Sequence, residues 1–173
     1  MTKLDLEQAN ALAEGLTNRD LSFDAVPEAP SLQQLLEYST SKGGETRLPA
    51  RTDLDPLEIR HLLPDLLIFD VVEGGADFRV RLVGTGVVEA FGFDGTGKLL
   101  STLFKPVVSN EAVLLYQVAL GWARPMIARS TMHYWRHKDH ISYESLFLPL
   151  AGDSVNVDKL LIGFSFRLGT PRS

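Results

Sequence analysis

Three apolar segments in the C-terminal part of the chain decide the fold: MIARSTMHYW (126–135), ISYESLFLPL (141–150) and KLLIGFSFRL (159–168). All three contain the β-branched and aromatic residues that favour strands. Residues 136–140 and 151–158 connect them and are too short to hold a crossover helix, so neighbouring strands must run antiparallel. The sequence therefore predicts an antiparallel meander of three strands.

A second pair of strands precedes the meander. Residues 65–72 form a dense apolar run, and residues 78–83 alternate between apolar and polar side chains. The turn between them, residues 73–77, contains two glycines and is short enough to require an antiparallel hairpin.

Helices are predicted between the hairpin and the meander, over residues 84–92 and 109–120, with a glycine-rich loop at 93–98. In the longer helix Ala112, Leu115, Tyr116 and Ala119 recur at helical spacing. Two strands, several helices and three strands in this order predict an α+β fold, in which one sheet carries its helices on one face.

The start of the folded part shows two helix-capping patterns. Ser31 and Gln34 have the spacing of a capping box and precede an apolar stripe that ends at Gly43-Gly44. Asp55, Pro56 and Glu58 predict a second box on a short helix over 56–63. We expect the folded domain to span residues 30–170.

Residues 1–29 are predicted to be an acidic, partly helical tail. A helix is expected over residues 4–16, with Leu12 and Leu16 one turn apart. The segment 1–30 carries six acidic and two basic side chains, so most of the net negative charge of the protein lies there.

Composition limits the function classes. A chain of 173 residues, 45% of them hydrophobic, is long enough for one well-buried domain. It has no cysteine, which excludes disulfides, thiolate metal sites and cysteine nucleophiles. No apolar run approaches the roughly 18 residues of a membrane span, and we expect a cytoplasmic protein without membrane contact.

Four motifs in the predicted order resemble a family of compact, stand-alone PAS-domain proteins found mainly in alphaproteobacteria. They are RTDLDP (51–56), RVRLVGT (79–85), FGFDGTG (91–97) and LPL (148–150). The resemblance covers residues 31–168. It implies a five-stranded antiparallel sheet, a cavity for a small molecule between sheet and helices, and signalling through protein contacts. It implies no reaction and identifies no cofactor, so we expect a non-enzymatic bacterial sensory or regulatory module.

The main alternative is a nucleotide-binding protein or small-molecule enzyme that uses the loop 92–98. GFDGTGK has the glycine and lysine spacing of a phosphate-binding loop. Leu99 stands where such a loop needs Ser or Thr for magnesium, and a helix rather than a buried parallel strand precedes it. The loop is therefore predicted to be structural.

Metal and nucleic-acid sites are not expected. His133, His137 and His140 cluster near a turn but match no strong zinc spacing. Residues 124–138 hold four basic and two aromatic side chains, a combination that can bind single-stranded nucleic acid. A solvated hairpin explains both patterns, and we predict no catalytic residue and no metal ligand.

Strand alternation divides the side chains of the sheet into two sets, and a one-residue slip in a strand would exchange the set that faces the cavity. One face of the predicted sheet mixes bulky apolar groups with a few hydroxyl groups, as small-molecule pockets do. The candidates, with one residue from the long helix, are Tyr116, Met132, Tyr134, Tyr143, Ser145, Phe147, Ile162 and Phe164.

The opposite face is predicted to mediate contacts between chains. Ile127, Arg129 and Trp135 share one parity, and Ile127 and Trp135 would be exposed apolar anchors there. The segment 4–16 or a helix over 31–38 could cover them, from the same chain or from a second one. A homodimer is the expected assembly, and a signalling protein is a further candidate partner.

Overall fold

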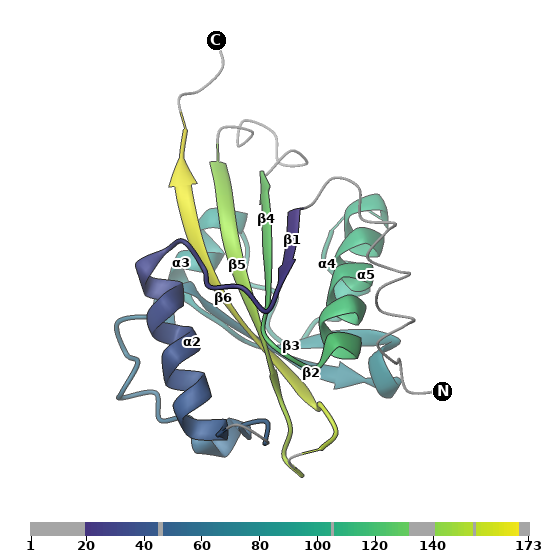
Figure 1. The fold of residues 1–173 in the computed structure, drawn as a ribbon. Coiled ribbons are helices and arrows are strands. Elements are labelled where there is room, and N and C mark those ends of the chain that lie inside the picture. Colours follow the sequence, from purple (N-terminus) through teal and green to yellow (C-terminus); the bar gives the residue numbers. More distant parts are fainter. Residues whose placement is uncertain (1–19, 45–46, 105, 132–140, 154, 170–173) are drawn as a thin grey trace.

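The computed structural model describes residues 20–44, 47–104, 106–131, 141–153 and 155–169. Its centre is a six-stranded antiparallel sheet with the order β1-β4-β5-β6-β2-β3 (Figure 1). The α+β class is confirmed. The helix expected over residues 4–16 lies outside the described residues.

The predicted hairpin and meander are both confirmed. β2 (Leu66–Val72) pairs with β3 (Asp77–Val83), and the meander consists of β4 (Met126–Thr131), β5 (Ile141–Leu150) and β6 (Lys159–Leu168). The hairpin joins the meander through β2 and β6, a pairing between distant segments.

The expected number of five strands is wrong, because a strand lies inside the predicted tail. β1 (Asp20–Phe23) pairs antiparallel with β4 and forms one edge of the sheet. This strand is too short to show a clear alternation, and its partner lies in the last third of the chain. Only the tertiary fold reveals it.

The prediction that helices cover one face is also wrong, because the described helices cover both (Figure 1). α3 (Thr85–Phe91), α4 (Leu100–Leu103) and α5 (Pro106–Trp122) pack on the inner face. α2 (Pro30–Gly43) packs on the outer face. Antiparallel strands send alternate side chains to opposite faces, and here both sets are apolar, so both need cover.

The close fit of α2 depends on a residue without a side chain. A Cβ at Gly163 of β6 would lie 2.5 Å from Leu35 Cδ2 and 2.9 Å from Leu32 Cδ2. The absence of a side chain there lets the apolar stripe of α2 rest directly on the backbone of the sheet.

The capping box predicted at Ser31 and Gln34 does not form. Ala29 is the N-cap of α2, Pro30 takes the first helical position, and Gln33 Nε2 donates to the Pro27 carbonyl at 2.7 Å. Pro30 fits that position because it has no amide hydrogen to satisfy. The amides of Glu28 and Ala29, which precede the helix, donate instead to a carboxylate of the sheet.

A buried carboxylate on the outer face holds the start of α2. Glu144 of β5 is 3% exposed and accepts hydrogen bonds from the Ala29 amide at 2.9 Å and the Glu28 amide at 3.1 Å. It also accepts a hydrogen bond from Nε of Arg129 on β4 at 3.0 Å, and Nη2 of the same guanidinium forms an ion pair with it at 2.9 Å. Burial by itself would raise the pKa of Glu144, but these hydrogen bonds and the Arg129 charge outweigh it and lower that pKa below its ordinary value.

The second predicted capping box is wrong as well. Residues 56–62 form successive turns rather than a helix, and Asp55 Oδ1 accepts only the Leu57 amide, at 2.9 Å. Glu58 turns away to accept the Tyr38 hydroxyl at 2.7 Å and to pair with Lys42 at 2.8 Å. Contacts with α2 therefore replace the local capping.

Replacing Glu144 with Gln is expected to lower the free energy of unfolding by about 3 kcal/mol at pH 7, because it leaves Arg129 without its buried partner. The lowered pKa means that this stabilisation is complete above the ordinary value of 4.5 and is lost as the pH falls through the folded value. Urea unfolding should show that the free energies of unfolding of the native protein and Glu144→Gln become more similar as the pH falls from 7 to 3.5. Glu89→Gln, at an exposed position, is the control. A difference in free energy of unfolding that stays constant over this pH range would contradict the stabilising role of the ionised Glu144 carboxylate.

Gly84→Ala is expected to destabilise the protein by about 3 kcal/mol. An added Cβ would lie 2.3 Å from the backbone oxygens of Leu63 and Pro64, which cannot move aside as a flexible side chain can. At Gly152 the nearest atom to an added Cβ is a side-chain oxygen of Asp158, at 3.2 Å. Thermal unfolding should therefore separate Gly84→Ala clearly from the control Gly152→Ala.

Candidate ligand-binding site

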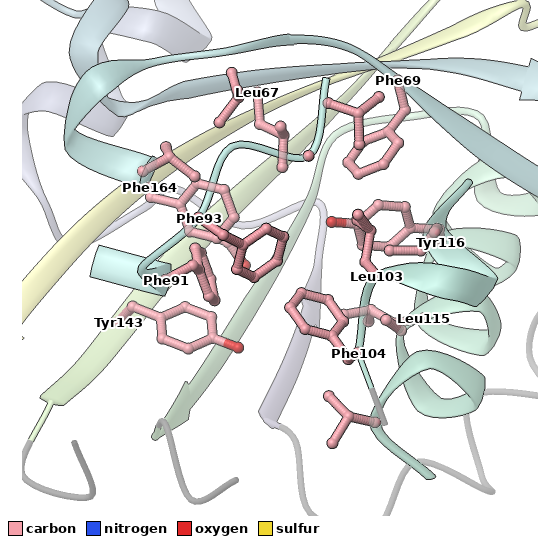
Figure 2. Close-up of a pocket in the computed structure, with 18 of the residues that line it drawn as sticks. Leu67, Phe69, Phe91, Phe93, Leu103, Phe104, Leu115, Tyr116, Tyr143 and Phe164 are labelled. Atoms are coloured by element: carbon pink, nitrogen blue, oxygen red, sulfur yellow. The ribbon is translucent and has the colours of Figure 1, made fainter. Parts of the chain in front are cut away.

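An apolar cavity lies between the inner face of the sheet and helices α3 to α5. Its volume is about 80 Å³. Strands β2, β3, β5 and β6 form its floor, and the segment from α3 to α5 forms its roof and walls (Figure 2). The residues that line it are Leu67, Phe69, Val80, Val83, Val87, Phe91, Phe93, Gly95, Leu100, Leu103, Phe104, Val108, Ala112, Leu115, Tyr116, Tyr143, Ser145, Phe147 and Phe164.

The lining carries no Asp, Glu, Lys, Arg or His. Its polar side-chain groups are the hydroxyls of Tyr116, Tyr143 and Ser145. The Ser145 hydroxyl donates to the Ala128 carbonyl of the neighbouring strand at 3.0 Å. A charged ligand would lose its hydration here without gaining a counter-charge, so the cavity favours an uncharged molecule.

Eight of the nineteen lining residues are aromatic, and most of their ring contacts are edge to face. Tyr116 packs against Phe69, Phe78 and Phe147 with centroid distances of 4.9, 5.5 and 5.2 Å. On the other side Phe91 contacts Phe164 at 5.7 Å. Figure 2 shows Phe91, Phe93 and Tyr143 close together, with Tyr116 of α5 across the cavity from them. Such contacts hold the rings in defined orientations.

The structure brings most of the predicted cavity residues together. Tyr116, Tyr143, Ser145, Phe147 and Phe164 line the cavity. Ile162 lies in the same inner-face core but does not line the cavity. Met132 and Tyr134 lie outside the described residues.

Sequence reasoning missed the wall formed by residues 91–104. Phe91, Phe93, Leu103 and Phe104 belong to it, and Phe93 packs on Phe104 at 5.4 Å. The glycines of this segment indicated a loop, and its aromatic residues have no regular spacing. The high density of Phe at positions 91, 93 and 104 was the one available signal.

The residues predicted to form an interface between chains do not form an exposed patch among the described residues. Ile127 is not an exposed anchor: it is 1% exposed and lies in the core beneath α2 of its own chain. Arg129 is the partner of Glu144 and also lies 3.7 Å from both Asp20 and Glu28. Trp135 lies outside the described residues. The segment that covers the outer face is thus the one predicted near residues 31–38, and it comes from the same chain.

The glycine-rich loop 92–98 uses its backbone amides internally. The Gly97 amide donates to the Val80 carbonyl at 2.8 Å, and the Lys98 amide donates to the Gly95 carbonyl at 2.9 Å. Asp94 accepts both the amide and the hydroxyl of Thr96, and these bonds lower the pKa of Asp94. A loop that holds a carboxylate and points its amides at its own chain offers no cradle for phosphate.

Metal and nucleic-acid chemistry find no support in the described ranges. Among those residues no three His, Asp or Glu side chains gather as metal ligands. His133, His137 and His140 lie outside them. In the basic stretch Arg124 stacks on Trp122, with its guanidinium carbon 4.3 Å from the ring centroid, and pairs with Asp24 at 3.6 Å.

No helix in the described part of the chain has the length and apolar character needed to cross a membrane.

Comparison with curated proteins and with solved structures found no match. The family model of the PAS domain matches residues 28–164, which is well over half of the sequence. That range begins just before α2, contains the hairpin and the helices that enclose the cavity, and ends within β6, the last strand of the meander. The chain therefore belongs to the PAS-domain family.

Proposed function

We propose that this protein is a sensory or regulatory module that binds a small, uncharged, apolar molecule in the inner cavity. The observation that carries the proposal is the lining itself, which combines aromatic rings from five elements of the fold with a few hydroxyl groups and no charged side chain. Small-molecule sites typically combine such apolar walls with a few polar groups. The walls offer no pair of acid and base groups, so we infer that the protein acts by binding and not by catalysis.

The volume limits the size of the ligand. An engineered cavity of about 150 Å³ binds benzene or xenon, whereas this one measures about 80 Å³. A ligand smaller than benzene fits without rearrangement. A larger one must displace Phe91, Phe93 or Phe104, which are half-buried. Phe91 ends the short helix α3, and the other two lie in connecting segments rather than on the sheet.

The strand β5 offers a route from the cavity to the start of the chain. Tyr143 and Ser145 line the cavity, and Glu144 between them points to the opposite face. There the Glu144 carboxylate holds the amides of Glu28 and Ala29. A ligand that shifts β5 would therefore also shift the junction between β1 and α2.

Signalling through this junction calls for a second chain or another protein. We propose a homodimer in which residues 1–19, which precede β1, contribute to the contact. The outer face beneath α2 is already covered, so Ile127 no longer supports an interface there. The acidic side chains and leucines of the segment 1–19 are the remaining sequence feature that fits such a contact.

Filling the cavity should abolish binding of an apolar probe. Ala112→Leu adds bulk to α5 inside the cavity, whereas Asn110→Leu adds the same side chain at an exposed position of the same helix. Methyl NMR of the full chain under xenon should show saturable shifts at Leu67, Val87 and Leu115 in the native protein and in Asn110→Leu. They should be lost in Ala112→Leu. Equal shifts in both variants would place the probe elsewhere.

Sedimentation equilibrium tests the assembly. The full chain is expected to be dimeric at micromolar concentration, and a chain starting at Asp20 is expected to be monomeric. The shortened chain must begin there and not at Pro30, because β1 and the amides bound by Glu144 belong to the fold. A monomeric full chain would refute the dimer, and a dimeric shortened chain would show that the segment 1–19 is not needed.

A further inference from the structure

The outer face carries a second hollow that is larger than the inner cavity. It has a volume of about 370 Å³ and lies between residues 51–64, the strands β2 and β3, and the start of α3. We call it the outer groove. Its lining includes Arg51, Arg60, Leu66, Ile68 and Leu82. We propose that the outer groove binds an amphipathic anion, a molecule with an aliphatic chain and a terminal carboxylate.

A bulge in the hairpin turns an apolar side chain into the groove. Phe78 and Val80 of β3 are buried on the inner face, and simple alternation would place Leu82 beside them. The register between β2 and β3 shifts at Ile68 and Phe69. Leu82 therefore lines the outer groove and remains 39% exposed.

The walls of the groove are fixed by backbone contacts. Gly84 lies so close to Leu63 and Pro64 that no Cβ would fit between them, which holds the start of α3 against the turn before β2. Leu66 and Ile68 of β2 are buried beneath the groove, and Leu54 and Ile59 are buried on its other side. The hollow is thus bordered by closely packed parts of the fold.

The charges of the groove have one sign. Arg51 and Arg60 line it, and its lining contains no acidic residue. Arg51 is oriented by a hydrogen bond from Nη1 to the Leu54 carbonyl at 3.1 Å. The nearby cations Lys42 and Arg47 are each paired with a carboxylate, but neither Arg51 nor Arg60 has an ion pair with any described residue.

The apolar floor of the groove matches the aliphatic chain of an amphipathic anion, and its two arginines match the anionic group. The aliphatic chain would cover Leu82, Ile68 and Leu66, and the carboxylate would meet a guanidinium, which can bind it through two hydrogen bonds. The volume lies within the range of small-molecule sites. The inner cavity is too small for such a chain and has no cation, so the two sites select different chemistry.

The probe for the test is decanoate, titrated into the full chain and followed by methyl NMR. We expect saturable shifts at Leu54, Ile59 and Leu82. Arg60→Gln should weaken decanoate binding by roughly three- to tenfold, less than a buried charged hydrogen bond would give because Arg60 is exposed. The control Arg81→Gln removes the same charge from an exposed arginine outside the groove lining and should leave the affinity within about twofold of the native value.

Uncharged 1-decanol separates the contribution of the arginines from that of the apolar floor. It should bind more weakly than decanoate, and its affinity should be the same in the native protein and in Arg60→Gln. Added salt should weaken only decanoate binding. The proposal is overturned by an absence of saturable shifts, by equal effects of Arg60→Gln and Arg81→Gln, or by shifts at Leu115 and Val87 of the inner cavity in place of the groove.

Discussion

One buried carboxylate connects the parts of this domain that are far apart in the sequence. Glu144 is almost fully buried on β5, and it binds Arg129 on the neighbouring strand and the two amides that precede α2. Arg129 in turn donates to Ser22 of β1 at 3.2 Å. A buried charge is costly unless all its hydrogen-bonding capacity is used. The amides that precede α2 bind Glu144 directly, and β1 contacts Arg129, which is the charged partner of Glu144.

The sheet separates two chemical environments because its side chains alternate between the faces. The inner face meets an aromatic roof and encloses a cavity without charge. The outer face carries the Glu144 network at one end and the arginine-lined groove at the other. β5 contributes to both environments: Tyr143 and Ser145 face the inner cavity, whereas Glu144 lies with the outer network. A movement of β5 would therefore change both the lining of the inner cavity and the hydrogen bonds of Glu144 on the outer face.

Local patterns predicted the elements well where the pattern and the final environment agreed. The hairpin at residues 66–83 and the meander after residue 126 follow from strand alternation and short connections, which need no knowledge of distant partners. Predictions failed where a distant group competed with a local one. Glu58 was expected to cap its own turn but binds Tyr38 and Lys42 of α2. Ser31 was expected to be the N-cap of α2, but Ala29 takes that position and its amide donates to Glu144.

The sequence by itself determined the fold class, the antiparallel pairing within the hairpin and the meander, and which residues of β5 and β6 share a face, because a period of two is visible in the chain. Which of the two faces lies toward the cavity was decided by the tertiary structure. Only the tertiary structure decided that β1 extends the sheet, that α2 covers Ile127, and that residues 91–104 form the cavity wall. It also decided that Leu82 faces outward, through a bulge that no alternation pattern reveals. Each of these depends on contacts between segments far apart in the chain, and a single sequence carries no record of which distant segments will meet.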